Sequence, residues 1–288
     1  VWTVFPLNFF SKKAANSENT FSVMTYNVNY FAYNNSRSLH EHNDILDYIY
    51  SKNPDIVLMQ ESIDVKFENM PSLSKADIDT LRSRYPYYTK VSNSDPSILS
   101  KHPFKIQKSL HIMKSKQYPV VSIYTVNIKG KEITFVNCHL QSNGLSSGDK
   151  SLLRNFMSQD SINNMSLAHK VKNSVLAKVV EASSLRAEQA LEVRKNIDEI
   201  SGPVIVCGDF NDTPSSWTYR TIRGSDLADC YCDCGLGHTI TYHENRLYFR
   251  LDHIFYKGEG LKAIRIERGN DKFSDHYPLM ATFECVEN

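Results

Sequence analysis

Residues 203–212 read PVIVCGDFND, an apolar run that stops abruptly at carboxylate and amide side chains. The β-branched residues of 204–207 are typical of a buried β-strand. Asp209 and Asn211 follow directly, so the strand delivers polar groups to the edge of its sheet. The stretch therefore predicts a sheet whose rim carries ionisable side chains.

The same arrangement recurs at six places along the chain. A lone Asp, Asn or His beside a strand is usually structural, because such residues make turns. Six rims that combine carboxylates, amides and two histidines instead match what a hard divalent cation and a phosphoryl group need. The polar residues at these rims are Asn27, Glu61, His139, Asp209 with Asn211, Asp252, and Asp275 with His276.

The apolar pattern predicts a mixed α/β (α+β) fold. The turn at Lys129-Gly130 joins two strands as an antiparallel hairpin, which excludes a purely parallel sheet. A helix over 39–52 has apolar residues on one face and stops before Pro54. The expected strands are 21–26, 55–59, 120–128, 133–138, 203–207, 251–256, 261–266 and 279–285.

Residues 142–200 read as a helical insertion between two of these strands. Residues 142–151 are polar and contain two glycines, which predicts a loop, and 166–200 has apolar residues at helical spacing. Such an insertion could shape access to a site at the rim.

Composition indicates one ordinary globular domain. The chain has 288 residues, of which 41% are hydrophobic and 23% charged, and a net charge of +1, so affinity for a polyanion would need a local patch. No apolar run reaches the about 20 residues of a membrane-spanning helix. Residues 1–20 form an extension that we expect either to follow a removed signal or membrane segment or to make a short strand or lid. The catalytic domain is expected over 21–288.

The six cysteines do not predict a disulfide scaffold. Cys138 and Cys207 lie inside apolar runs and are expected to be buried thiols. Cys230, Cys232 and Cys234 form a C-x-C-x-C run in a loop-like region, where either a disulfide or a bound metal is an alternative.

Taken in order, seven short motifs resemble those of the endonuclease/exonuclease/phosphatase superfamily, the deoxyribonuclease-like metal-dependent phosphoesterases, and look most like uncharacterised bacterial members. The resemblance extends from residue 21 to the end of the chain, and the ordered set is far more specific than any single motif. The motifs are 24–28 (MTYNV), 60–62 (QES), 98–103 (ILSKHP), 137–140 (NCHL), 208–212 (GDFND), 250–254 (RLDHI) and 274–278 (SDHYP).

The resemblance implies a four-layer α/β/β/α sandwich of two packed, largely antiparallel sheets, with the site at their ends. It also implies that Glu61 is the central ligand of a Mg²⁺ ion, for which Mn²⁺ or Ca²⁺ can substitute. Asn27 and Asp275 would complete or support that sphere.

The remaining roles come from the same resemblance. Asp209 would orient or deprotonate the attacking water, and Asn211 would hold a phosphate oxygen. His276, oriented by Asp252, would stabilise charge in the transition state. His139 would contact the phosphate or protonate the leaving group.

Several neighbours of these residues have structural interpretations. His253 follows Asp252 in a strand and should face the opposite side of the sheet. Lys101 and His102 are expected in a loop at the sheet edge. Arg186 and Gln189 share a helix face that we expect to be solvated, with a place near the site as the alternative.

The leading functional hypothesis is a phosphodiesterase or nuclease that hydrolyses a P–O bond by in-line attack of water. The alternatives are a phosphomonoesterase, a sphingomyelinase-like phosphodiesterase of phospholipid head groups and, in a different class, a catalytically silent binding domain. The substrate is a nucleic acid, a phospholipid head group or a small phosphate ester. We expect a monomer, and the bacterial resemblance favours an exported or membrane-associated protein.

Overall fold

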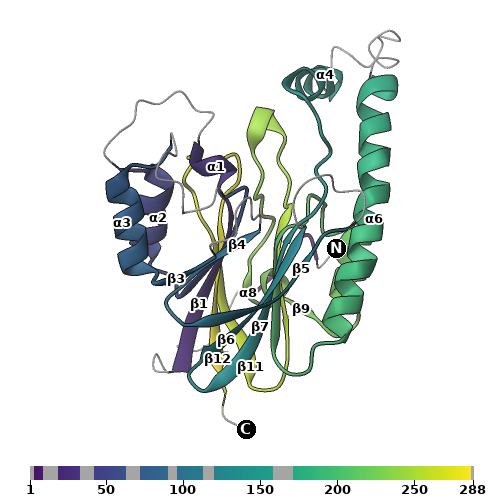
Figure 1. The fold of residues 1–288 in the computed structure, drawn as a ribbon. Coiled ribbons are helices and arrows are strands. Elements are labelled where there is room, and N and C mark those ends of the chain that lie inside the picture. The colour runs from purple at the N-terminus through teal and green to yellow at the C-terminus, as the bar shows by residue number, and fades with distance from the viewer. Residues whose placement is uncertain are drawn as a thin grey trace.

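The structure, a computed structural model, describes residues 3–8, 19–32, 42–62, 72–89, 96–112, 120–157 and 171–286. Two six-stranded sheets form its centre (Figure 1). The first sheet has the order β11 (Leu261–Arg268), β12 (Leu279–Cys285), β1 (Thr20–Asn27), β2 (Ile56–Gln60), β4 (Ser97–Ser100), β3 (Tyr87–Tyr88). The second has the order β5 (Phe104–Leu110), β6 (Val121–Ile128), β7 (Lys131–His139), β8 (Val204–Asp209), β10 (Asp252–Lys257), β9 (Ala228–Asp229).

Each sheet contains one parallel pair among antiparallel neighbours. The parallel pairs are β1 with β2 and β7 with β8, and the remaining pairs of both sheets are antiparallel. The turn at Lys129-Gly130 has φ angles of 54° and 81°, which suit a tight hairpin. The predicted mixed, largely antiparallel arrangement is confirmed.

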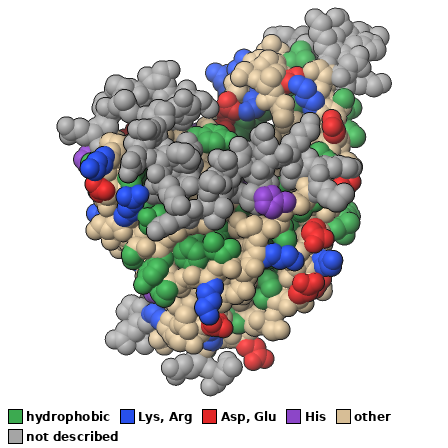
Figure 2. All heavy atoms as spheres, viewed as in Figure 1, with side chains coloured by type: hydrophobic (Ala, Val, Ile, Leu, Met, Phe, Trp, Pro, Cys, Tyr) green, Lys and Arg blue, Asp and Glu red, His purple; other side chains and the backbone are tan. Residues whose placement is uncertain are grey.

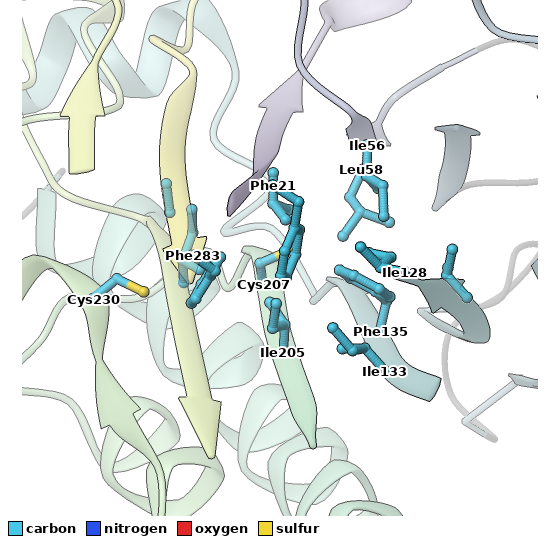
Figure 3. Close-up of a cluster of buried hydrophobic side chains, with 14 of the residues drawn as sticks. Phe21, Ile56, Leu58, Ile128, Ile133, Phe135, Ile205, Cys207, Cys230 and Phe283 are labelled. Atoms are coloured by element: carbon cyan, nitrogen blue, oxygen red, sulfur yellow. The ribbon is translucent and has the colours of Figure 1, made fainter. Parts of the chain in front are cut away.

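The central core lies between the two sheets. Side chains such as Phe21 and Phe283 of the first sheet meet Phe135 and Ile205 of the second (Figure 3). Alternate residues of the same strands face outward, because side chains alternate along a strand. Val206, for example, packs in a separate outer cluster.

Helices cover both outer faces and complete the four predicted layers (Figure 1). The first sheet is covered by α2 (Asp44–Lys52) and α3 (Lys75–Arg84), which share one buried cluster with it. The second is covered by α6 (Ala177–Asp198) and α7 (Trp217–Arg223). The side chain of Asn43 accepts hydrogen bonds from the first turn of α2, and Ser74 with Asp77 forms a capping box on α3.

Parts of the expected secondary structure are corrected. The expected loop over 142–151 extends only to residue 146, because α4 (Ser147–Met157) begins at the next residue, and α6 is preceded by a π-helical turn, η3 (Val171–Leu176). The strands β3, β4, β5 and β9 were not expected. The parts of the predicted helices at 39–41 and 166–170 lie outside the described residues. The remaining elements are α1 (Asn29–Ala32), α8 (Cys230–Cys234) and η4 (Glu244–Arg246).

The cysteines are free thiols, and Cys138 and Cys207 are buried as predicted. The disulfide alternative for Cys230, Cys232 and Cys234 is wrong, because these residues lie in α8 without a disulfide, and the expected loop there is a short helix.

In the N-terminal segment, Leu7 makes a single antiparallel bridge with Leu236. None of the described helices is long and apolar enough to span a bilayer. The domain boundaries, including the status of residues 1–20, stay a prediction.

Candidate active site

Three polar residues form a row across the ends of neighbouring strands in the second sheet. The register pairs His139 of β7 with Asp209 of β8, and Asp209 with Asp252 of β10. All three are in phase with residues of the central core, such as Ile205 and Ile254, and so lie on the inner face. The rim predicted from sequence is therefore a continuation of the core between the sheets.

The first sheet reaches this row through Asn27 and Glu61. Asn27 Nδ2 donates to Asp209 Oδ2 at 3.1 Å and to Glu61 Oε1 at 3.2 Å. His139 Nε2 lies 3.7 Å from the same Glu61 oxygen. The two sheets thus share one continuous polar cluster.

His276 lies between two carboxylates. Its Nδ1 contacts Asp252 Oδ2 at 2.8 Å, and its Nε2 lies 3.6 Å from Asp209 Oδ2. Burial alone would lower the pKa of His276, but the charges of Asp252 and Asp209 outweigh burial and raise it to about 10. The Asp252 contact fixes Nδ1 as a donor and leaves Nε2 directed toward Asp209.

Asp209 is almost fully buried, with 1% of its surface exposed. Burial raises its pKa to about 6, against the opposing charge of His276. One carboxylate oxygen accepts the backbone N–H of Asn211 at 2.8 Å, and the Asn211 side chain lies 3.3 Å from the other. The pKa of Asp209 is thus close to the value that suits a base at neutral pH.

Backbone conformations that few residues adopt hold this cluster. Glu61 has a φ of 50° and Asn211 a φ of 51°, both in the left-handed region, which is uncommon outside glycine. Gly208 has a φ of 133°, and a Cβ there would lie 1.9 Å from the carbonyl oxygen of Cys138. Backbone in the left-handed region therefore occurs directly after both β2 and β8, at the two strand ends that carry Glu61 and Asp209.

The cluster opens into a cavity of about 460 Å³ that Glu61, Asp209, Asn211, Asp275 and His276 help to line. Glu61 and Asp275, which come from distant parts of the sequence, thus face the same space. The carboxylates of Glu61 and Asp275 carry oxygen atoms that a hard divalent cation takes as ligands, and Asn27 holds Glu61 through Nδ2, so these residues fit such an ion.

Asp209, Asp252 and His276 also place ligand atoms within 4.8 Å of one another. The same geometry forms a hydrogen-bonded relay, in which Nδ1 of His276 donates to Asp252 and Nε2 is directed toward Asp209. These three residues are therefore a second group that could hold an ion, besides Glu61 and Asp275.

Arg186 and Gln189 correct the sequence prediction of a solvated helix face, because each is only 2% exposed. Arg186 donates to the Gln141 carbonyl at 2.9 Å and pairs with Asp212 at 3.4 Å, and it lines the cavity. Gln189 accepts from the Gln141 backbone N–H at 2.8 Å. This face of α6 therefore holds the loop that follows His139.

A buried polar contact beneath the site was missed. Gln60 Nε2 donates to Asn137 Oδ1 at 2.7 Å, and Asn137 Nδ2 donates to the carbonyls of Met59 and Ser97 at 3.1 and 2.8 Å. Both residues lie in the motifs quoted above. The sequence feature that could have predicted their contact is an amide on the inner face of each of two apolar strands.

The other neighbours behave as predicted. His253 is buried on the outer face of β10, where its Nε2 contacts the Asp212 carbonyl at 3.0 Å. Lys101 and His102 follow β4 at the sheet edge, and Lys101 lies 3.7 Å from Asp55.

A carboxylate- and histidine-lined cavity at the ends of two packed sheets fits the hydrolysis of a phosphate ester. The sequence profile of the Endonuclease/Exonuclease/phosphatase family matches residues 24–276. The chain belongs to this family, whose members hydrolyse phosphate ester bonds with the help of divalent metals.

Comparisons with individual proteins give one partial sequence match and several matches of the fold. A UPF0294 protein of Vibrio cholerae is 32% identical over 103 residues, which is 34% of either chain, so the match spans about a third of that relative. Truncated TDP2 of Caenorhabditis elegans has a TM-score of 0.59 at 20% identity, covering 92% of this chain and 98% of its own.

Two further solved structures show the same fold. A family member from Bacteroides vulgatus has a TM-score of 0.59 at 18% identity, covering 92% of this chain and 99% of its own. D. rerio TDP2, solved with a single-strand DNA product, has a TM-score of 0.58 at 18% identity, covering 93% and 100%.

Proposed function

We propose that this chain is a Mg²⁺-dependent phosphodiesterase that cleaves a P–O bond by in-line attack of water. The observation that carries the proposal is the placement of Asp209 and His276 Nε2, 3.6 Å apart, in one cavity with Glu61 and Asp275. A base and a cationic donor thus face the same space as two further carboxylates.

Glu61 and Asp275, supported by Asn27, would hold the cation. When bound there, the ion would supply Lewis-acid polarisation of a phosphoryl oxygen and neutralise its charge. Asn27 contacts both Glu61 and Asp209, so it would keep the cation-binding carboxylate in a fixed relation to the base.

Asp209 would orient the attacking water and accept its proton. Asn211 holds one Asp209 oxygen through its backbone N–H, and its side chain also donates to the Leu140 carbonyl at 3.0 Å. The carboxylate is therefore fixed before substrate arrives, which lowers the entropic cost of reaching the attack geometry.

His276 would donate a hydrogen bond from Nε2 to the phosphoryl group as negative charge develops there. Asp252 fixes the ring through Nδ1, so little reorganisation is needed during reaction. His139, on the far side of Asp209 in the row of strand ends, is placed to contact the phosphate or the leaving group.

Diester hydrolysis is favoured over monoester hydrolysis by a relative. D. rerio TDP2, solved with a single-strand DNA product, has this fold over nearly the full chain. Phosphomonoesterase activity is the alternative within the same chemistry. We further infer a monomer, as the default for one globular domain, and, from the bacterial resemblance alone, a protein that is exported or membrane-associated.

Hydrolysis of bis(4-nitrophenyl) phosphate and of 4-nitrophenyl phosphate tests the proposal. The protein is stripped with EDTA, and Mg²⁺, Mn²⁺ or Ca²⁺ is then added in separate reactions. We expect activity to vanish with EDTA, to return with Mg²⁺, and to favour the diester. Activity that persists in EDTA would overturn the metal dependence, and a preference for the monoester would overturn diester specificity.

Reaction in ¹⁸O-labelled water tests the mechanism. Direct attack of water on phosphorus places the label in the phosphate product. Label in the released alcohol would contradict P–O cleavage.

A further inference from the structure

The cavity has a second half that the proposed chemistry does not use. Besides the polar residues of the rim and the ring of Tyr242, six apolar side chains line it. These are Leu145, Leu153, Val179, Leu247, Phe249 and Leu251. Apolar side chains gathered beside reactive polar groups in one concave space are typical of a ligand site.

This apolar wall comes from the insertion and from the segment before β10. Leu153 lies on α4, and Val179, Ser183 and Arg186 line the cavity at the i, i+4 and i+7 positions of one face of α6. Phe249, from the segment after η4, remains 40% exposed. The apolar half is thus partly open to solvent, where a bound apolar group would exclude water from it.

The parts of this wall are tied together. Lys150 of α4 pairs with Glu244 of η4 and lies over the ring of Tyr242, with Nζ 5.4 Å from its centroid. Tyr242 donates from its hydroxyl to the same Glu244 carboxylate at 2.9 Å. α4 therefore contacts the segment that carries Leu247 and Phe249, so the apolar wall is a built feature of the fold.

The cavity is not organised for a chain of phosphates. Among the described residues that line it, the lysine and arginine side chains are Lys150 and Arg186, and each is paired with a carboxylate, of Glu244 and Asp212 respectively. A polynucleotide groove needs cationic side chains that can meet successive phosphates. Among the described side chains on the face shown in Figure 2, Lys and Arg are interspersed with Asp and Glu and do not form one basic area.

We propose that the apolar half of this cavity binds an apolar alcohol group, alkyl or aryl, of the phosphate ester whose phosphoryl group lies at Asp209 and His276. This inference rests on the proposed function for the place of the phosphate. Val179, Leu153 and Phe249 then determine specificity, and the substrate is an amphiphilic phosphodiester.

Binding of alkylphosphonates tests this without turnover, because their C–P bond is not hydrolysed. Methyl-, butyl- and hexylphosphonate are titrated calorimetrically into the full chain with Mg²⁺. Burying one methylene strengthens binding by up to about fourfold, so we expect hexylphosphonate to bind at least about tenfold more tightly than methylphosphonate. Equal affinities, or no binding by any member of the series, would overturn the inference.

Variants locate the site. Val179→Gln and, separately, Phe249→Ser should reduce the hexyl-to-methyl affinity ratio to about threefold or less. Val180→Gln is the matched control: Val180 is the next residue on α6, is 61% exposed and does not line the cavity, so the wild-type ratio should persist. A wild-type ratio in both cavity variants would place the alkyl chain elsewhere and overturn the inference.

Hydrolysis of bis(4-nitrophenyl) phosphate by the same preparations separates the two proposals. If the protein hydrolyses the diester but binds the three phosphonates with equal affinity, the apolar subsite is refuted and the phosphodiesterase proposal stands. If affinity rises from methyl- to hexylphosphonate but the diester is not hydrolysed, the phosphodiesterase proposal is refuted and the cavity remains a binding site for apolar phosphates.

Discussion

The two sheets contribute differently to the site although each has a parallel pair of strands at its centre. The first sheet ends in Asn27 and Glu61, and the Glu61 side chain is 28% exposed. The second ends in Asp209 and Asp252, each 1% exposed. The partly exposed carboxylate of Glu61 suits a cation that keeps bound water, whereas the buried carboxylate of Asp209, whose pKa burial raises, suits a base. Burial therefore separates the roles that we propose for these two carboxylates.

The largest effect is expected from the second sheet. Asp209→Asn removes the base but keeps the size of the side chain, so kcat should fall by up to about 10,000-fold. The Mg²⁺ concentration at half-maximal activity should not change, because Asp209 is not assigned to the cation. Asp79→Asn, an exposed carboxylate on α3, is the control. If the activity of Asp209→Asn recovered at high Mg²⁺, Asp209 would instead be a ligand of the cation, and the two sheets would not have separate roles.

Glu61→Gln removes the carboxylate that the first sheet is proposed to contribute to the cation site. At limiting Mg²⁺ we expect activity to fall by about 1,000-fold, because one ligand charge is lost, and to recover partly as Mg²⁺ rises. Glu132→Gln, an exposed carboxylate on β7, should leave the Mg²⁺ dependence unchanged. A loss of activity that Mg²⁺ does not alter would contradict the assignment of Glu61.

Asn137→Leu tests the buried contact between Gln60 of the first sheet and Asn137 of the second. Two backbone carbonyls would lose their side-chain donor and Gln60 its nearest acceptor, so the free energy of unfolding should fall by about 3 kcal/mol in urea denaturation. The double variant Gln60→Met with Asn137→Leu should recover part of this loss, because both buried partners become apolar. Strictly additive losses would show that the two amides do not act as a pair.

The smallest effect concerns His253, which faces away from the site. Burial, assisted by the charge of Arg250 and opposed by Asp229 and Asp252, lowers its pKa to about 4. Between about pH 6.5 and pH 4 the unfolded chain therefore binds more protons than the folded one, so this residue costs stability as pH falls.

His253→Gln keeps an N–H for the Asp212 carbonyl and cannot take up a proton. The loss of unfolding free energy from pH 7 to pH 4 should be about 2 kcal/mol smaller in this variant than in the wild type. Parallel pH dependences of the two proteins would refute the assigned protonation behaviour.

The mixed α/β class and the polar rim could be predicted from the residues because both depend on simple periodicity, whereas the four-layer sandwich was implied by the family resemblance. Polar residues in phase with an apolar strand, such as Asp209 after Ile205 and Cys207, must lie at the end of the buried face. The left-handed backbone at Glu61 could not be predicted, since nothing local favours that conformation in a glutamate.

The surroundings of the rim were harder to predict for a different reason. The faces of α6 are set by what the insertion packs against, so the burial of Arg186 and Gln189 was not visible in helical spacing. The short strands β3 and β9 contain two residues each, too few to show alternation. Tertiary contacts decide such elements.

His139, Asp209 and Asp252 stand on adjacent hydrogen-bonded strands, and inter-strand spacing of about 4.8 Å is a property of every sheet. The distances between these three residues are therefore set by main-chain geometry and not by α4 or η3. α4, η3 and the apolar positions of α6 that line the cavity can accordingly be redesigned as a unit, while Arg186 and Gln189 continue to hold the loop that follows His139. New substrate preferences could arise in this scaffold, by evolution or by engineering, while the bond-breaking apparatus stays in place.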